Sequence, residues 1–213
     1  MGNTSGHVYG LTIFSPIIGD EDDQHLYVSH AIALRDYLAS LAKDHKSPFA
    51  TLNSTHLARL VVMDDVVYVG APACEEHLKS RYLVFETNFD GDLDTYLTRM
   101  ATETGDMVDG VWQHCVGYPG RADAGAFVAY MKKCQIETTF FFADVNDHTV
   151  QENLKALQVQ SAIAHFIAKQ QGRSPAEIQR AFGELLALLN KAPAPLAGGI
   201  RAEKTAAEDR PHE

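Results

Sequence analysis

Ten histidines are the chain's largest supply of side chains that exchange a proton near neutral pH or bind a metal. No two of them stand four residues apart, which is the spacing of a two-histidine metal site on a helix. His30 repeats with apolar residues at helical spacing, so we expect it in the core. His114 and Tyr118 belong to the segment WQHCVGYP (112–119), the densest group of reactive side chains. We expect both at the mouth of a pocket, His114 as a candidate catalytic residue and Tyr118 as a ligand contact.

Polar side chains also alternate with apolar ones along two expected strands, 56–63 and 82–89. Successive side chains of a strand point to opposite faces, so Glu86 and Asn88 share the face that helices do not cover. An arginine tolerates the helix side of a sheet poorly, which places Arg59 on the same open face, beside Glu86. The residues expected on the helix side of the second strand are Leu83, Phe85, Thr87 and Phe89.

An open sheet face with few polar groups among apolar ones is either a subunit interface or the wall of a ligand pocket. We therefore treat Arg59, Glu86 and Asn88 as candidate ligand-binding residues, with His56 as a further contributor. An ordinary cross-strand ion pair between Arg59 and Glu86 on a solvated sheet is the simpler alternative. A catalytic role for either residue is the third.

The elements that position these residues follow a regular order. Strands are expected at 8–16, 56–63, 82–89 and 137–145; the alternation is clear in the third of them, 82–89, and less decisive in 56–63. Helices are expected between the first and second strands and between the third and fourth. The acidic run from Asp90 to Asp94 is expected to be a turn and a helix N-cap, because it lacks the closing glutamate of a calcium loop.

Two more helices follow the fourth strand, and the sequence marks the start of each. Thr149 with Glu152, and Ser174 with Glu177, have the spacing of capping boxes. The whole order predicts an α+β fold: a ferredoxin-like βαββαβ antiparallel sheet with a C-terminal helical extension. We expect a single domain over residues 1–190 and a disordered tail over 191–213. Whether the long 64–80 loop covers a pocket is left open.

Composition limits the classes of function. At 46% hydrophobic and 22% charged residues, 213 residues suffice for a core without disulfides. The formal net charge of −10 argues against nucleic acid or an anionic membrane as a partner. The three cysteines form no CxxC pair, and the sequence shows neither a signal-peptide pattern nor an apolar run long enough to cross a bilayer. These features predict a cytoplasmic protein.

Four segments carry a resemblance to known proteins: THLARLVVMDD (55–65), LKSRYLVFETNFDGDLDTYL (78–97), VWQHCVGYPG (111–120) and IETTFFFADVNDHTV (136–150). Over about residues 8–170 the chain resembles a bacterial family of soluble proteins to which no reaction is assigned. Its general pattern is similar to the dimeric α/β-barrel superfamily, which includes dye-decolourising peroxidases, chlorite dismutase-like haem proteins and small monooxygenases. The resemblance implies a homodimer with a pocket either between sheet and helices or inside the barrel, which in some members holds haem.

In the peroxidases of that superfamily a GxxDG motif supplies a distal aspartate. The segment TNFDG (87–91) is its nearest counterpart here; it has the Asp-Gly pair but not the first glycine. The resemblance implies that Asp90 would act as the distal acid–base group if haem were bound. His165, or else His148, would then be the proximal iron ligand.

Three hypotheses of function follow. The first is a homodimeric protein that holds a small, partly apolar molecule on the open sheet face. The second is an oxidoreductase, either haem peroxidase-like or cofactor-free monooxygenase-like. The third is a non-catalytic interaction module whose open face serves only as a subunit interface. The sequence does not decide whether the protein is an enzyme.

Overall fold

The computed structural model describes residues 2–19, 28–67, 70–71, 76–197 and 199 of the 213. The described chain separates into two compact units, Met1–Asp147 and His148–Glu213, and each is described by itself. None of the described helices is both long enough and apolar enough to cross a bilayer. Most of the predicted 191–213 tail lies outside the described residues.

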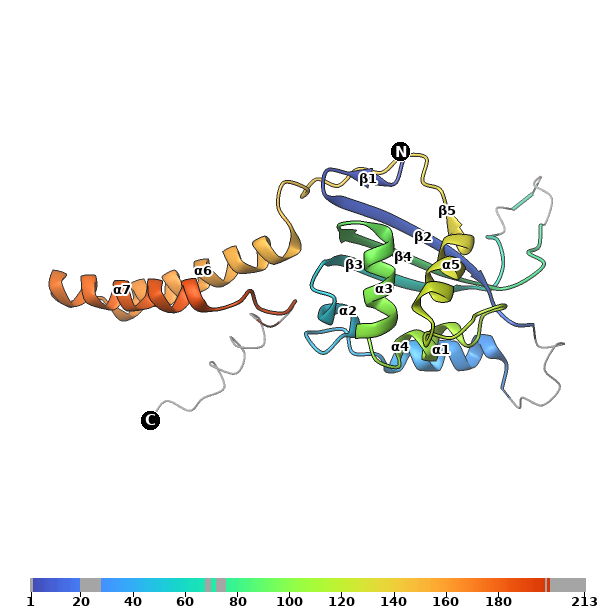
Figure 1. Ribbon diagram of the computed structural model, residues 1–213, viewed down its shortest axis with the longest axis horizontal. Coiled ribbons are helices and arrows are strands. Elements are labelled where there is room, and N and C mark those ends of the chain that lie inside the picture. The colour runs from blue at the N-terminus through green and yellow to red at the C-terminus, as the bar shows by residue number, and fades with distance from the viewer. Residues whose placement is uncertain (1, 20–27, 68–69, 72–75, 198, 200–213) are drawn as a thin grey trace. The chain divides into compact units, whose positions relative to one another are not determined.

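The first unit is an antiparallel sheet with helices (Figure 1). Its elements are, in chain order, β1 (Thr4–Ser5), β2 (Val8–Pro16), α1 (His30–Ser40), α2 (Pro48–Thr51), β3 (Thr55–Met63), β4 (Tyr82–Asp90), α3 (Leu93–Glu103), α4 (Met107–Trp112), α5 (Ala124–Cys134) and β5 (Gln135–Ile136). The strands are arranged in the order β1-β2-β4-β3, and β5 also pairs with β2. Every pairing is antiparallel, which confirms the α+β class.

The expected fourth strand over 137–145 is not formed. Pairing with β2 stops at Ile136, and residues 137–147 are neither helix nor strand. Their backbone donors find side chains instead of a neighbouring strand: the Thr138 amide donates to Asn3 Oδ1 at 2.7 Å, and the Ala143 amide to Ser5 Oγ at 3.1 Å. The segment therefore pairs with no neighbouring strand despite its many residues that favour strands, because polar side chains at and next to β1 accept hydrogen bonds from its backbone amides.

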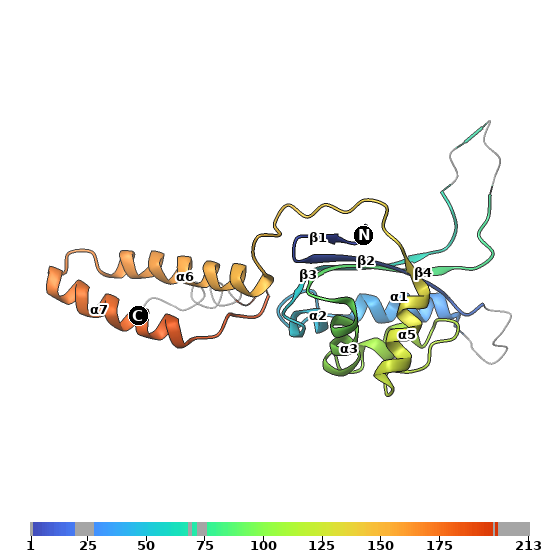
Figure 2. The same ribbon diagram turned by 45° about the horizontal axis from the view of Figure 1, so that its top comes forward.

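Alternation along β4 and β3 agrees with the sequence. The four residues expected on the helix side of β4 are all fully buried, and Ala58, Leu60 and Val62 of β3 pack against the same core. Helices α1, α3 and α5 all lie on that side of the sheet (Figure 2). Arg59, whose parity is opposite to that of Leu60, is therefore on the open face as predicted.

Aromatic contacts organise the core between sheet and helices. The ring of Phe85 lies 5.4 Å from that of Trp112 in an edge-to-face contact, and 5.9 Å from that of Phe49. Phe89 stacks on Tyr96 of α3 with ring centroids 3.7 Å apart. The buried Tyr96 hydroxyl is satisfied by Thr55 of β3 at 3.0 Å, so α3 is joined to the sheet by both stacking and a hydrogen bond.

The Asp90–Asp94 run is a turn and a helix cap, as expected. Asp92 is the N-cap of α3, and its Oδ1 accepts from the Thr95 amide at 2.9 Å. Gly91, between the two aspartates, has φ +101, a conformation that favours glycine. The turn therefore fixes both the end of β4 at Asp90 and the start of α3.

The second unit contains two helices, α6 (Val150–Lys169) and α7 (Pro175–Lys191), and both predicted capping boxes are present. The two helices contact each other through Phe166 and Phe182, whose ring centroids are 5.6 Å apart. Lys155 Nζ donates to the carbonyls of Leu189 and Ala192 at 2.7 and 2.6 Å. A cation from α6 thus caps the C-terminus of α7, where the helix dipole favours it.

Two phenylalanines of the first unit provide a matched test of this core. Phe85 is fully buried, whereas Phe140 is 83% exposed in the segment after β5. Phe85→Ala should lower the free energy of unfolding by about 3–5 kcal/mol, because it removes buried apolar surface and leaves a cavity. Phe140→Ala should change it by less than about 0.5 kcal/mol. Denaturant titrations followed by the fluorescence of Trp112, the only tryptophan, report on this unit, and equal effects would contradict the described packing.

Candidate functional site

The centre of the open sheet face carries a row of three polar side chains from three neighbouring strands. The register places Thr12 of β2 and Arg59 of β3 on either side of Glu86 in β4. Arg59 Nη2 donates to Glu86 Oε2, so the residues that the sequence placed side by side form an ion pair. Their side chains are 66% and 35% exposed, and a pair this solvated contributes only about 0–1 kcal/mol to stability.

Apolar side chains flank this row. Leu57 and Val61, two residues to either side of Arg59 on β3, are 53% and 44% exposed, and Ile136 of β5 stands opposite Thr12. The β2 side of the face is partly covered by the segment that follows β5 (Figure 2). There Phe141 lies directly on Gly10, whose missing side chain leaves the space for the ring. The uncovered part of the open face therefore lies over β3 and β4.

One end of this face holds a second polar pair, between His56 and Asp90. His56 Nε2 lies 2.8 Å from Asp90 Oδ1, and the two side chains are only 19% and 11% exposed. Asn88, the third candidate residue of β4, faces Leu57 in the same register and so stands between this pair and the Arg59 row. The structure thus brings together five predicted site residues on one surface: His56, Arg59, Glu86, Asn88 and Asp90.

The proximity of His56 to Asp90 was not expected from the sequence. Simple alternation places His56 on the face opposite to Leu57, but the register shifts between Thr55 and Leu57, as at a β-bulge. A bulge leaves one residue unpaired and re-aims its side chain. Asn53, just before the strand, has φ 46, and a non-glycine residue with positive φ is unusual.

His114 and Tyr118 are not part of the open face. They follow α4, and Tyr118 packs on the core between helices and sheet. His114 Nδ1 lies 3.0 Å from His30 Nδ1, and burial together with the nearby His30 lowers the pKa of His114. His30 is half-buried at the start of α1. Two histidines that are far apart in the sequence therefore form a pair on the helix-covered side of the sheet.

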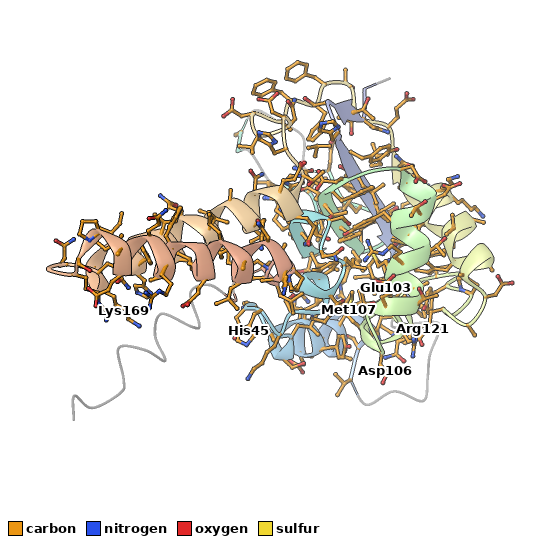
Figure 3. All side chains as sticks on the ribbon, turned by 60° about the vertical axis from the view of Figure 1, so that its left-hand side comes forward. His45, Glu103, Asp106, Met107, Arg121 and Lys169 are labelled. Atoms are coloured by element: carbon orange, nitrogen blue, oxygen red, sulfur yellow. The ribbon has the colours of Figure 1, made fainter. Side chains whose placement is uncertain are left out.

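The contacts of Tyr118 indicate a structural role. Its hydroxyl donates to Asp109 Oδ1 at 2.6 Å, and burial and that hydrogen bond raise the pKa of Tyr118. Arg121 donates from Nε to Asp109 at 2.8 Å and from Nη2 to Asp106 at 2.7 Å. Arg121 and Asp106 lie close together in Figure 3. These contacts attach the loop after α4 to that helix, so Tyr118 stabilises the position of the loop.

The residues expected to contact haem if it were bound are divided between the two units: Asp90 belongs to the first, and His148 and His165 belong to the second. His165 is exposed on α6, and Asp90 is engaged with His56. Neither residue lines the apolar groove of about 630 Å³ along Gln151–Gln160 of α6. His148 is exposed as well. Within the described part of the chain, no three His, Cys, Asp or Glu side chains are grouped as a metal site.

A small polar pocket on the first unit was also missed from the sequence. It has a volume of about 320 Å³ and is lined by Asn3, Thr4, Tyr9, Lys132, Gln135 and Glu137. Asn3 and Gln135 both donate to the Tyr9 hydroxyl, at 3.2 and 2.9 Å. These residues come from three separate segments that only the folded sheet brings together, so no local motif marks them.

Cys115 stands beside His114 in the sequence, but its thiol is not activated. It is buried, and burial raises its pKa to about 12, with Cys134 adding to the shift. The thiolate is the reactive form, so the raised pKa and the burial both lower the reactivity expected of Cys115. Cys74 lies outside the described residues.

Thiol labelling tests this assignment. Under native conditions at about pH 8, iodoacetamide should modify Cys115 at least about a hundredfold more slowly than in denaturant, because both access and the thiolate fraction are low. Cys134, which is half-buried, is the internal comparison and should react first. Peptide mapping by mass spectrometry measures both rates; faster labelling of Cys115 than of Cys134 would contradict the packing.

Comparisons of this chain with protein-family models, with curated proteins and with solved structures find no match. The resemblance seen in the sequence therefore stays a prediction. What the protein does must be argued from the geometry of the open sheet face.

Proposed function

We propose that the protein is a homodimer that binds a small, partly apolar molecule between the open sheet faces of its two subunits. The observation that carries this proposal is the composition of that face. Exposed Leu57 and Val61 flank a central polar row, with the desolvated His56–Asp90 pair at one end. A surface that combines exposed apolar side chains with a few paired polar groups is compatible with an interface or a pocket wall.

The strand order supports the type of dimer. Without the short β1, the strands are ordered β5-β2-β4-β3, and this order supports the proposed ferredoxin-like βαββαβ unit. Helices α1, α3 and α5 occupy one side only (Figure 2). In such a unit the other side is available to a second sheet, and two facing sheets make a dimeric α/β barrel.

Self-association explains why the face is apolar at its margins and polar at its centre. In a two-fold symmetric interface the same patch serves both subunits, so Leu57 and Val61 would meet apolar side chains of a second copy. The ion pair of Arg59 and Glu86 would then be shielded from water. Shielding strengthens the charged hydrogen bond, but it also removes the water that would accept from the remaining N–H donors of Arg59. A bound molecule can supply the missing acceptors.

The polar groups define the chemistry of the ligand. Arg59 offers several N–H donors of which only Nη2 is engaged with Glu86, and Asn88 offers both a donor and an acceptor. The apolar side chains around them suit a ring or a short hydrocarbon. The ligand class is therefore a small molecule with an apolar body and at least one oxygen that accepts from Arg59.

The dimer is tested by one substitution and a matched control. Leu57→Glu places a charge on the proposed interface and should convert a micromolar dimer to a monomer, because burying an unpaired carboxylate is costly. Ile32→Glu introduces the same charge at a similarly exposed position of α1 and should leave the dimer intact. Sedimentation velocity measures the assembly. A monomeric parent protein would contradict the proposed dimer. So would the same oligomeric state for both variants.

Ligand binding is tested separately. Saturation-transfer NMR against a set of small aromatic and aliphatic acids and phenols should detect binders, and Arg59→Met should weaken them at least about tenfold by removing a charge-assisted hydrogen bond. Lys79→Met, a similarly exposed cation outside the face, is the control. A dimer that binds none of these compounds would instead indicate a pure interaction module.

A further inference from the structure

We propose that His56 is a general base, oriented by Asp90, that removes the proton from an acidic hydroxyl of the molecule bound on the open face. This inference rests on the proposed function and adds a reaction to it. The substrate class is a phenol or an enol: a compound with an apolar body and a hydroxyl that ionises near neutral pH. Asp90 acts through His56 and is a positioning residue.

The hydrogen bond between the two side chains decides which nitrogen can accept a proton. Asp90 Oδ1, 2.8 Å from His56 Nε2, is a carboxylate oxygen and can only accept. The proton of the neutral imidazole is therefore on Nε2, and the lone pair is on Nδ1. Among the described residues no side chain or backbone group donates to His56 Nδ1. The atom that can take a proton is thus not engaged by a described donor, and the His56 side chain retains 19% of its exposure.

The backbone around the pair is held at several points. The Asp90 amide donates to the Ser54 carbonyl at 2.9 Å, and the Gly91 amide donates to the His7 carbonyl at 3.2 Å. The irregular pairing between Thr55 and Leu57 turns His56 toward Asp90. Bulges are frequent beside active sites because they re-aim a side chain in this way. A base held by its neighbours needs little reorganisation before it reacts.

The proton transfer balances without any further reactant. The proton moves from the ligand hydroxyl to His56 Nδ1, and the electron pair of the O–H bond stays on the ligand oxygen. The new imidazolium is stabilised by the Asp90 carboxylate. Arg59 is three residues along β3 from His56, on the same face, and its guanidinium can approach the oxyanion that forms. A cation beside a developing negative charge stabilises the ionised product.

Burial distinguishes this pair from the other one on the face. The His56 and Asp90 side chains are 19% and 11% exposed, whereas Arg59 is 66% exposed. A hydrogen bond to a carboxylate is stronger where water is largely excluded. The pair is therefore positioned to bias the protonation state of a bound molecule, which a solvated pair would not do.

The test uses p-nitrophenol, whose phenolate absorbs at longer wavelength than its phenol. One pH unit below the pKa of the free probe, about one-tenth of it is ionised. Bound to the parent protein, about half of it should be ionised, a fivefold increase that corresponds to a shift of one pH unit. His56→Gln should bind the probe within about threefold of the parent, by equilibrium dialysis, but abolish this increase. His148→Gln, an exposed histidine of the second unit, is the control.

Each outcome separates the inference from the proposed function. Binding without ionisation, or equal ionisation by the parent and His56→Gln, overturns the general base and leaves the ligand site standing. No binding of p-nitrophenol overturns the phenol class and with it this inference. The dimer and the wider ligand set are judged by their own experiments above. Unfolding followed by Trp112 fluorescence checks that each variant is folded.

The role of Asp90 has a readout that does not depend on any ligand. Nitrogen-15 shifts of the His56 ring show which nitrogen carries the proton at about pH 8. The parent protein should show the proton on Nε2. Asp90→Asn should move at least about a third of the population to Nδ1, because an amide can also donate to Nε2. Asp147→Asn, an exposed carboxylate, should change nothing. A proton on Nδ1 in the parent would overturn the proposal.

Discussion

The antiparallel register of β4 between β2 and β3 is the constraint on which the rest of the structure depends. Because side chains alternate with a period of two, a slip of one residue would move every side chain of β4 to the opposite face. The buried Phe85 and Phe89 would then face outward and Glu86 would face the core. The aromatic contacts of Phe85 with Trp112 and of Phe89 with Tyr96 oppose that slip. The core therefore fixes which polar groups appear on the open face.

Much of this arrangement can be predicted from the sequence, since alternation is a local property. Glu86 and Asn88 are on the predicted face because the apolar residues alternate cleanly through β4, and Arg59 follows from the poor fit of an arginine on the helix side. The caps at Asp92 and Thr149 are equally local, because each requires only a side-chain acceptor and an amide a few residues away. Features that depend on a few adjacent residues can therefore be predicted from the sequence.

The failures all concern contacts that tertiary structure decides. The 137–145 segment has strand composition, but Asn3 and Ser5 from the other end of the unit take its backbone hydrogen bonds. His114 pairs with His30 across 84 residues, and no spacing rule could indicate that contact. The position of His56 depends on a single irregularity of pairing, which reverses its face. Single-residue geometry of this kind leaves almost no trace in a hydrophobic pattern.

The two polar pairs of the open face differ in what they can do, and the difference is one of solvation. In a single subunit Arg59 and Glu86 are exposed, so water and salt screen them, and each can exchange its partner for a ligand atom as the ligand binds. His56 and Asp90 are largely shielded, so separating them would leave a poorly solvated carboxylate, and the pair keeps its geometry. Binding favours the first kind of group, which can change partners at little cost. Proton transfer favours the second, which holds one nitrogen lone pair in a fixed direction, and this face places both kinds within a few residues of each other.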